Sequence, residues 1–287
     1  PGKSAIASAH PLATAAGMEI LARGGNAFDA AVAVSGALAV VEPNGSGMGG
    51  GGFYLLHRAA DGKQVVVDAR EVAPAAATRD MYLDAAGNPI EGLSTRHAKA
   101  AGIPGEPAGW QHLAQNYGRL PLAASLAPAI RLARQGVVIS ERMHEDLARV
   151  LADEGRVGDG SSEFARIYLV RGAAPPVGHR LRQPDLARSL EVLATGGADA
   201  FYRGPFARKL VAGVQSLGGI WTGDDLAAYR VVERAPVIAS YRGLRVVSAP
   251  PPSSGGVWLA SVLNVLAGYD LDQFDGATRT PVILEAL

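Results

Sequence analysis

Residues 44–53 have the sequence NGSGMGGGGF and separate a predicted helix from a predicted strand. The helix is expected over residues 26–41, which are apolar on nearly every side, so it should be buried. Phe53–Arg58 and Gln64–Asp68 are predicted strands, and Asp61-Gly62 between them is a typical hairpin turn. Because four consecutive glycines favour a backbone path on which no Cβ fits, close packing is expected around this turn.

The same glycines match the letters of a dinucleotide-binding fingerprint at residues 45–50. That fingerprint needs a strand before it and a helix after it, so that the helix N-terminus faces a pyrophosphate. Here a helix precedes and a strand follows, and no Lys-Ser or Lys-Thr pair follows as in a phosphate loop. Close packing of the glycines is therefore the favoured interpretation, with direct contact to a ligand as the alternative.

The composition indicates a folded chain with a sizeable core. Its 287 residues are 48% hydrophobic and 19% charged, which suits one or two domains. Lys plus Arg and Asp plus Glu both number 27, so no overall basic field would attract nucleic acid or an anionic membrane. The longest apolar segment has about 12 residues, short of the ~18 that a membrane span needs. The absence of cysteine excludes disulfides, thiolate metal sites and cysteine nucleophiles.

The remaining sequence predicts more helices and a second hairpin. Helices are expected over residues 11–23, 105–116, 122–134, 141–152, 184–195, 205–216 and 257–266, and strands over 237–241 and 244–248. Because the strands are few for so many helices, we expect the sheets to be completed by residues outside this sequence. The chain starts at Pro1 without Met and stops at Leu287 in helical composition, which suggests missing segments at both ends.

Arg70 and Glu71 stand where the second predicted strand ends. A planar guanidinium at a rigid strand end can hold a carboxylate through two parallel hydrogen bonds. From the residues alone, however, a surface or ion-paired arginine is the favoured interpretation of Arg70. Arg79-Asp80 is a similar pair with less to recommend it.

No complete nucleophile–base pair is evident in the sequence. Residues 44–48 approximate the Gly-x-Ser-x-Gly elbow of serine hydrolases poorly, because Asn44 and Met48 occupy both glycine places. Ser253 and Ser254 precede a predicted helix and can equally be capping residues. The histidines lack metal-ligand spacing and are interpreted as surface or core residues: His10, His57, His97, His112, His144 and His179.

Six segments, in order along nearly the whole chain, resemble segments of the γ-glutamyltransferase family. Each is weak alone, but six in register are specific. They are residues 24–33 (GGNAFDAAVA), 48–53 (MGGGGF), 68–74 (DAREVAP, continued by TRDMY at 78–82), 102–110 (GIPGEPAGW), 117–121 (YGRLP) and 250–256 (PPPSSGG).

The resemblance implies a large subunit with the α/β N-terminal nucleophile hydrolase fold, a four-layer αββα sandwich completed by a small subunit. Residues 1–287 would then be the large-subunit part of one domain. In this family a single precursor cuts itself in two, and the new N-terminal Thr of the small subunit attacks the γ-glutamyl amide of glutathione. The acyl group then passes to water or an amino acid. Such a Thr serves as nucleophile and base, because its α-amino group accepts the hydroxyl proton at a pKa of ~7.7–8.0.

The resemblance also changes the interpretation of the strand-end pair. Arg70 matches the family arginine that binds the substrate α-carboxylate, and this role is now favoured. Glu71 is only an indirect candidate, with a surface carboxylate as an even alternative. No catalytic residue is expected in this chain, because the family Thr lies beyond Leu287. No metal or cofactor is expected either. Bacterial relatives are typically exported, so a periplasmic or extracellular location is expected.

Two alternatives remain at this point. Relatives resembling this family cleave glutaryl-cephalosporins or poly-γ-glutamate, which would keep the fold and change the acyl group. A non-catalytic homologue would keep Gly49–Gly52 and Arg70 without the chemistry.

Overall fold

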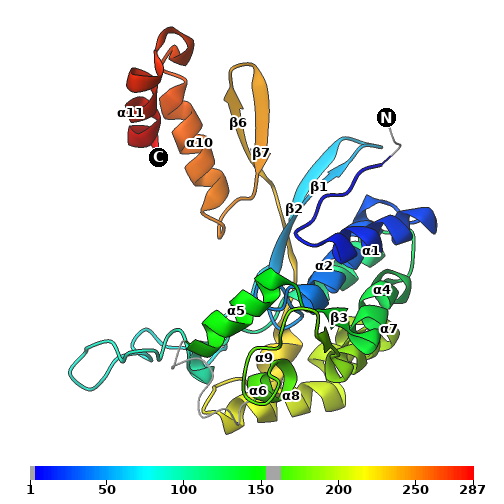
Figure 1. Cartoon of the computed structure of the whole chain (residues 1–287). Coiled ribbons are helices and arrows are strands. Elements are labelled where there is room, and N and C mark those ends of the chain that lie inside the picture. Colours follow the sequence, from blue (N-terminus) through cyan, green and yellow to red (C-terminus); the bar gives the residue numbers. More distant parts are fainter. Residues whose placement is uncertain (1–3, 153–162) are drawn as a thin grey trace. The chain divides into compact units, whose positions relative to one another are not determined.

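The computed structural model describes residues 4–152 and 163–287, which form two compact units (Figure 1). The first, here called the helical unit, contains the described residues within Pro1–Gly51 and Arg70–Arg230. The second, here called the strand unit, contains Gly52–Ala69 and Val231–Leu287. Each is described by itself.

The helical unit is built around the buried helix α2. Its helices are α1 (Pro11–Ala22), α2 (Ala27–Val41), η1 (Ala98–Ala100), α3 (Glu106–Asn116), α4 (Leu122–Gln135), α5 (Glu141–Ala152), α6 (Glu163–Tyr168), α7 (Pro184–Tyr202), α8 (Gly204–Ser216) and α9 (Gly223–Ala228). Two short strands, β3 (Val137–Val138) and β4 (Arg180–Leu181), pair antiparallel. Helix α2 packs against α1, α3 and α4, and α4 packs against α7 (Figure 1). The predicted burial of α2 is confirmed.

A capping box starts α2 at Asn26, where the predicted helix begins. The side chain of Asn26 accepts hydrogen bonds from the amides of Phe28 and Asp29, and the Asp29 carboxylate accepts one from the Asn26 amide at 2.8 Å. Asp29 is fully buried and also accepts from the amides of Arg119 (2.9 Å) and Leu120 (3.2 Å). One carboxylate therefore joins the start of α2 to the segment after α3, because it satisfies backbone donors of both.

Helix α7 changes direction at Gly197, whose φ of +66° no other residue type adopts readily. The predicted end of this helix at residue 195 is therefore confirmed for the first part of α7. The helical turn that follows it and ends at Tyr202 was not predicted.

The strand unit contains a three-stranded antiparallel sheet in the order β1 (Gly52–Arg58), β2 (Lys63–Ala69) and β5 (Val232–Arg234). Phe53 pairs with Asp68, and Asp68 pairs with Val232, so β2 is the central strand. The second hairpin, β6 (Val237–Tyr241) and β7 (Leu244–Ser248), packs against α10 (Gly255–Leu266) (Figure 1). The 3-10 turn η2 (Leu271–Gln273) and α11 (Gly276–Ala286) complete the unit. Both predicted hairpins are confirmed. Strand β5 was not predicted, and of α11 only the helical composition at its end is evident from the sequence.

Candidate functional site

The segment Arg70–Ala75 follows β2 directly, as the sequence predicts, and its backbone is fixed within the helical unit. Val72 forms a two-bond antiparallel bridge with Ile103: the Ile103 amide donates to the Val72 carbonyl at 2.8 Å, and the reverse bond is 3.3 Å. The carbonyl of Arg70 accepts a hydrogen bond from the hydroxyl of Tyr229 at 2.9 Å. The Arg70 side chain is exposed, while its backbone is held at both ends of this short stretch.

A buried carboxylate, that of Asp225, holds the far end of this segment. Its Oδ1 accepts from the Ala75 amide at 2.7 Å, and its Oδ2 accepts from the amide (2.8 Å) and hydroxyl (2.7 Å) of Thr222. Burial by itself would raise the pKa of the Asp225 carboxyl, but these hydrogen bonds together outweigh it and hold that pKa below its usual value. The carboxylate form is therefore the one that stabilises the fold.

This pKa shift predicts a pH dependence of stability. Because the folded-state pKa of Asp225 is depressed, its contribution is complete above the unfolded pKa of about 3.9 and is lost as pH falls through the lower folded-state pKa. The wild-type protein should therefore have a larger free energy of unfolding than Asp225→Asn, and this difference should be larger at about pH 6 than at about pH 3. Urea unfolding at both pH values measures this, and an equal difference at both would contradict it.

A cavity of about 420 Å³, here called the glycine-turn cavity, lies beside the turn between α2 and β1. Its lining consists of Ser35, Pro43, Gly45, Ser46, Gly47, Gly49, Gly50, Gly51, Glu71 and Glu106. Glu71 is thus part of this wall, next to Gly50: a Cβ on Gly50 would lie 3.3 Å from Glu71 Oε1. The predicted close packing of the glycines is confirmed at Gly50, whereas a Cβ on Gly45, Gly47 or Gly49 would meet nothing within 4 Å.

The glycine turn also positions the start of α3. The Gly50 carbonyl accepts hydrogen bonds from the amides of Gly105 (2.9 Å) and Glu106 (3.0 Å), which have no partner within the helix. The buried Glu106 carboxylate accepts from the Ser35 hydroxyl at 2.5 Å, and the Ser35 oxygen accepts from Trp110 Nε1 at 3.0 Å. A continuous set of hydrogen bonds therefore connects α2, α3 and the glycine turn.

The backbone opposite Glu71 has no room for a side chain. A Cβ on Gly102 would lie 2.9 Å from the Cβ of Glu71. Gly102→Ala is therefore expected to destabilise the protein by about 1–3 kcal/mol through overpacking. The matched control is Gly45→Ala in the same glycine turn, where a Cβ meets nothing within 4 Å. Urea unfolding of both variants measures the effect, and equal stability of the two would contradict this account.

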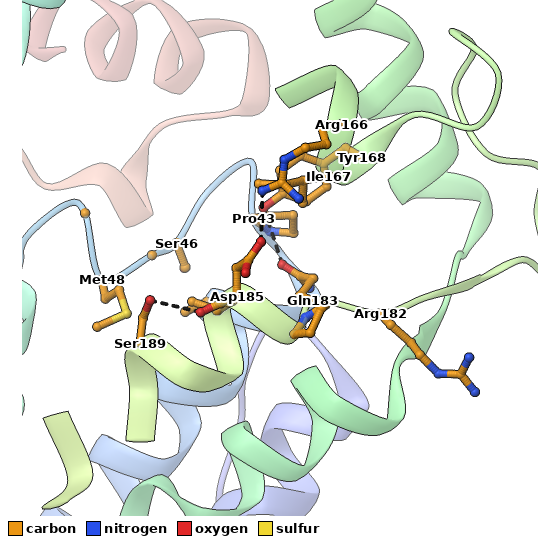
Figure 2. A pocket seen from close by; sticks show the side chains of 15 residues that line it. Pro43, Ser46, Met48, Arg166, Ile167, Tyr168, Arg182, Gln183, Asp185 and Ser189 are labelled. Atoms are coloured by element: carbon orange, nitrogen blue, oxygen red, sulfur yellow. Dashed lines mark hydrogen bonds and ion pairs between the residues drawn. The ribbon is translucent and has the colours of Figure 1, made fainter. Parts of the chain in front are cut away.

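A second cavity of about 550 Å³ shares part of the glycine turn with the first (Figure 2). Here Arg166 of α6 bonds Asp185 at the start of α7 (2.9 Å) and also pairs with Glu163. The buried Gln183 donates to the Val40 carbonyl at 2.8 Å and fixes the wall behind them. Because Arg166 is already paired with two carboxylates, it is a poor candidate for binding a third.

Arg70 lines neither of these two cavities, and Glu71 lines only the glycine-turn cavity. In an extended segment successive side chains point to opposite sides, which explains why neighbours 70 and 71 separate. The sequence thus predicts correctly that both residues follow a strand. Within the described residues, the structure places Glu71 in the wall of the glycine-turn cavity and Arg70 outside both of these cavities.

Several polar residues considered as candidates from the sequence lie at helix starts in the structure. His10 Nδ1 accepts from the Leu12 amide at 3.1 Å and caps α1. Ser254 occupies the N-cap position of α10 without a side-chain capping bond. Among residues 4–152 and 163–287, no group of three or more His, Asp or Glu side chains is arranged to hold a metal ion. No helix in these ranges combines the length and apolar character that crossing a membrane requires.

Sequence reasoning did not identify Glu106, Asp225 or Tyr229. Glu106 lies inside the segment 102–110 that carried the resemblance, so its polar character at a helix start was a usable signal. Asp225 three residues after Thr222 is the spacing of a capping box, which the structure confirms. Nothing in the local sequence around Tyr229 indicates that its hydroxyl reaches a residue 159 positions away.

The profile of the Gamma-glutamyltranspeptidase family matches residues 13–287. The chain belongs to the γ-glutamyltranspeptidase family. It is 41% identical over 283 residues to the glutathione hydrolase proenzyme of Escherichia coli K12, covering 98% of this chain and 48% of that protein. It is also 39% identical over 290 residues to the Acylase ACY 1 proenzyme of Pseudomonas sp. V22, covering 98% and 51%.

Solved structures of this family share the fold. The γ-glutamyltranspeptidase of Helicobacter pylori superimposes with a TM-score of 0.92 at 38% identity, covering all of this chain and 82% of that one. The predicted family and the predicted N-terminal nucleophile hydrolase fold are therefore confirmed. The chain spans about half the length of the curated family members that it matches.

Proposed function

We propose that this chain is the large subunit of a γ-glutamyltransferase that releases the γ-glutamyl group of glutathione and passes it to water or an amino acid. The observation that carries this proposal is 41% identity, across 98% of the chain, to a protein named glutathione hydrolase proenzyme. A proenzyme is a precursor, which fits a chain that matches about half of its relative. Residues 1–287 then form the large-subunit part of one domain.

In this proposal the chain binds substrate and a partner chain performs the chemistry. Arg70 holds the α-carboxylate of the γ-glutamyl donor by two parallel hydrogen bonds. Its exposed side chain and fixed backbone support that role, because a rigid backbone places the planar guanidinium reproducibly. Glu71 acts indirectly, as part of the wall beside Gly50.

The partner is a small subunit from the same precursor, and its N-terminal Thr is the nucleophile. Its α-amino group accepts the hydroxyl proton as the oxygen attacks the γ-glutamyl amide, and the leaving amine takes a proton in turn. The resulting γ-glutamyl ester is then cleaved by water or by the amino group of an acceptor. A two-subunit protein exported to the periplasm or the extracellular space completes the proposal, and export is an expectation from bacterial relatives.

A second candidate keeps the fold and changes the acyl group. Its support is the 39% identity to the Acylase ACY 1 proenzyme, which is close to the identity with the glutathione hydrolase. A γ-glutamyl group and a glutaryl group both end in a carboxylate at the same distance from the acyl carbon, and the glutaryl group lacks only the α-amino group. Arg70 can bind the carboxylate of either group, so the two candidates differ in whether the site also recognises the α-amino group.

Kinetics of the purified full-length protein separate these functions. The substrates are γ-glutamyl-p-nitroanilide, a glutaryl-cephalosporin and poly-γ-glutamate. A higher kcat/KM for γ-glutamyl-p-nitroanilide than for the others is expected. Preference for the glutaryl compound would replace the proposal with an acylase, preference for the polymer with a poly-γ-glutamate hydrolase, and turnover of none with a non-catalytic homologue.

A further inference from the structure

We infer that Tyr229 is a positioning residue for Arg70, because its hydroxyl holds the peptide group of the residue that carries the guanidinium. Tyr229 follows α9 directly and is 6% exposed. Its hydroxyl donates to the Arg70 carbonyl at 2.9 Å. This bond restrains the backbone of residue 70 itself, and with it the direction in which the side chain leaves the chain. The inference rests on the proposed role of Arg70 in binding the donor α-carboxylate.

The ring of Tyr229 is itself held in place by a second tyrosine. It stacks on Tyr202 with ring centroids 5.5 Å apart and an interplanar angle of 6°. The Tyr202 hydroxyl donates to the Pro104 carbonyl at 2.7 Å and accepts from the Ala108 amide at 3.3 Å. Burial raises the pKa of Tyr202, so it remains protonated and keeps its donor role. The ring of Tyr202 therefore supports the ring of Tyr229, while the Tyr202 hydroxyl bonds the backbone at Pro104 and Ala108.

The other contacts of this segment act further along the chain. The bridge to Ile103 is at Val72, and the carboxylate of Asp225 is at Ala75. Both would keep the segment folded if the Tyr229 hydroxyl were removed, but neither restrains the carbonyl of residue 70. Loss of this hydroxyl should therefore change the aim of one side chain and leave the local fold intact.

Binding a carboxylate by two parallel hydrogen bonds depends on the orientation of the guanidinium. Both N–H groups must lie near the plane of the two acceptor oxygens, so a small rotation at residue 70 weakens both bonds together. A displacement of a substrate-positioning group by about 1 Å can slow an enzyme reaction by about 10²-fold. A bond to the backbone of an exposed arginine can therefore influence substrate affinity without contacting the substrate.

The test is Tyr229→Phe in the full-length protein, which removes only the hydroxyl. The KM for γ-glutamyl-p-nitroanilide should rise by about three- to tenfold, with kcat within about twofold. Tyr202→Phe is the matched control, because it keeps the ring that stacks on Tyr229 and removes an equally buried hydroxyl that bonds the backbone at Pro104 and Ala108. Both variants should lower the melting temperature, but only Tyr229→Phe should change the donor KM.

A double variant separates positioning from general damage. In the Arg70→Ala background, Tyr229→Phe should leave the donor KM unchanged, since no guanidinium remains to be aimed. Three outcomes would overturn the inference and leave the role of Arg70 intact. Tyr229→Phe could raise the donor KM equally in both backgrounds, Tyr202→Phe could raise the donor KM as much as Tyr229→Phe does, or Tyr229→Phe could leave the donor KM unchanged. An unchanged donor KM in Arg70→Ala alone would instead overturn the proposed function, and the inference with it.

Discussion

Arg70→Ala should raise the KM for γ-glutamyl-p-nitroanilide by about 10- to 100-fold in the full-length protein, with a much smaller change in kcat. The loss corresponds to about 1.5–3 kcal/mol, the range for hydrogen bonds to a charged group. The α-carboxylate is remote from the amide that is cleaved, so its binding is similar in the ground state and the transition state. Removing such uniform binding changes KM more than kcat. Arg70→Lys keeps the charge without the planar pair of donors and should lie between.

Arg79→Ala is the matched control for this prediction. Arg79 is another exposed arginine in the segment that follows β2, and its side chain faces Asp80 at 3.6 Å with 96% of its surface exposed. Its replacement should leave the donor kinetics unchanged. A substrate that lacks the α-carboxylate, 4-aminobutyryl-p-nitroanilide, adds a second control, because Arg70→Ala should not weaken its binding. Unchanged KM for the γ-glutamyl donor in Arg70→Ala would remove the only substrate contact assigned to this chain.

Asp29→Ala should destabilise the protein by about 3–5 kcal/mol, the largest stability effect expected here. The fully buried carboxylate accepts hydrogen bonds from three backbone amides, those of Asn26, Arg119 and Leu120. Alanine would leave these donors without an acceptor in a site where water cannot replace it. Asp29→Asn keeps one acceptor oxygen and should lose less. Urea unfolding of the full-length protein measures both.

Asp84→Ala serves as the control for charge and for local bonding. Asp84 Oδ1 also accepts from two backbone amides, those of Ala86 and Asn88, each at 2.9 Å, but it is exposed. Water can satisfy those donors after the replacement, so the loss of stability should be much smaller than for Asp29→Ala. Equal losses in the two variants would show that burial of the Asp29 bonds contributes nothing.

Local signals in the sequence predicted the elements that depend on local chemistry. The cap of α2 follows from Asn26 and Asp29 three residues apart, and the break in α7 follows from Gly196-Gly197. Strand β5 has only three residues, too few for an alternating pattern. It forms because it pairs with β2, where Arg234 Nε bonds the buried Asp68 at 2.8 Å. That bond joins residues 166 positions apart, so no local pattern indicates it.

The candidate site, too, was predictable only in the parts that depend on local sequence. Arg70 and Glu71 are recognisable as a charged pair at a strand end, and the resemblance to a family gives Arg70 its role. The wall that Glu71 shares with Gly50 and the buried Glu106 depends on contacts between distant segments. Their meeting follows from tertiary packing, which a single sequence does not encode in any local pattern.

Mass spectrometry of the purified product of the full-length gene tests the central claim most directly, namely that this chain is one of two subunits made from a precursor. The account predicts two polypeptides that remain associated, the larger containing residues 1–287 and the smaller beginning with Thr. A single uncut polypeptide that retains γ-glutamyl transfer activity would contradict it.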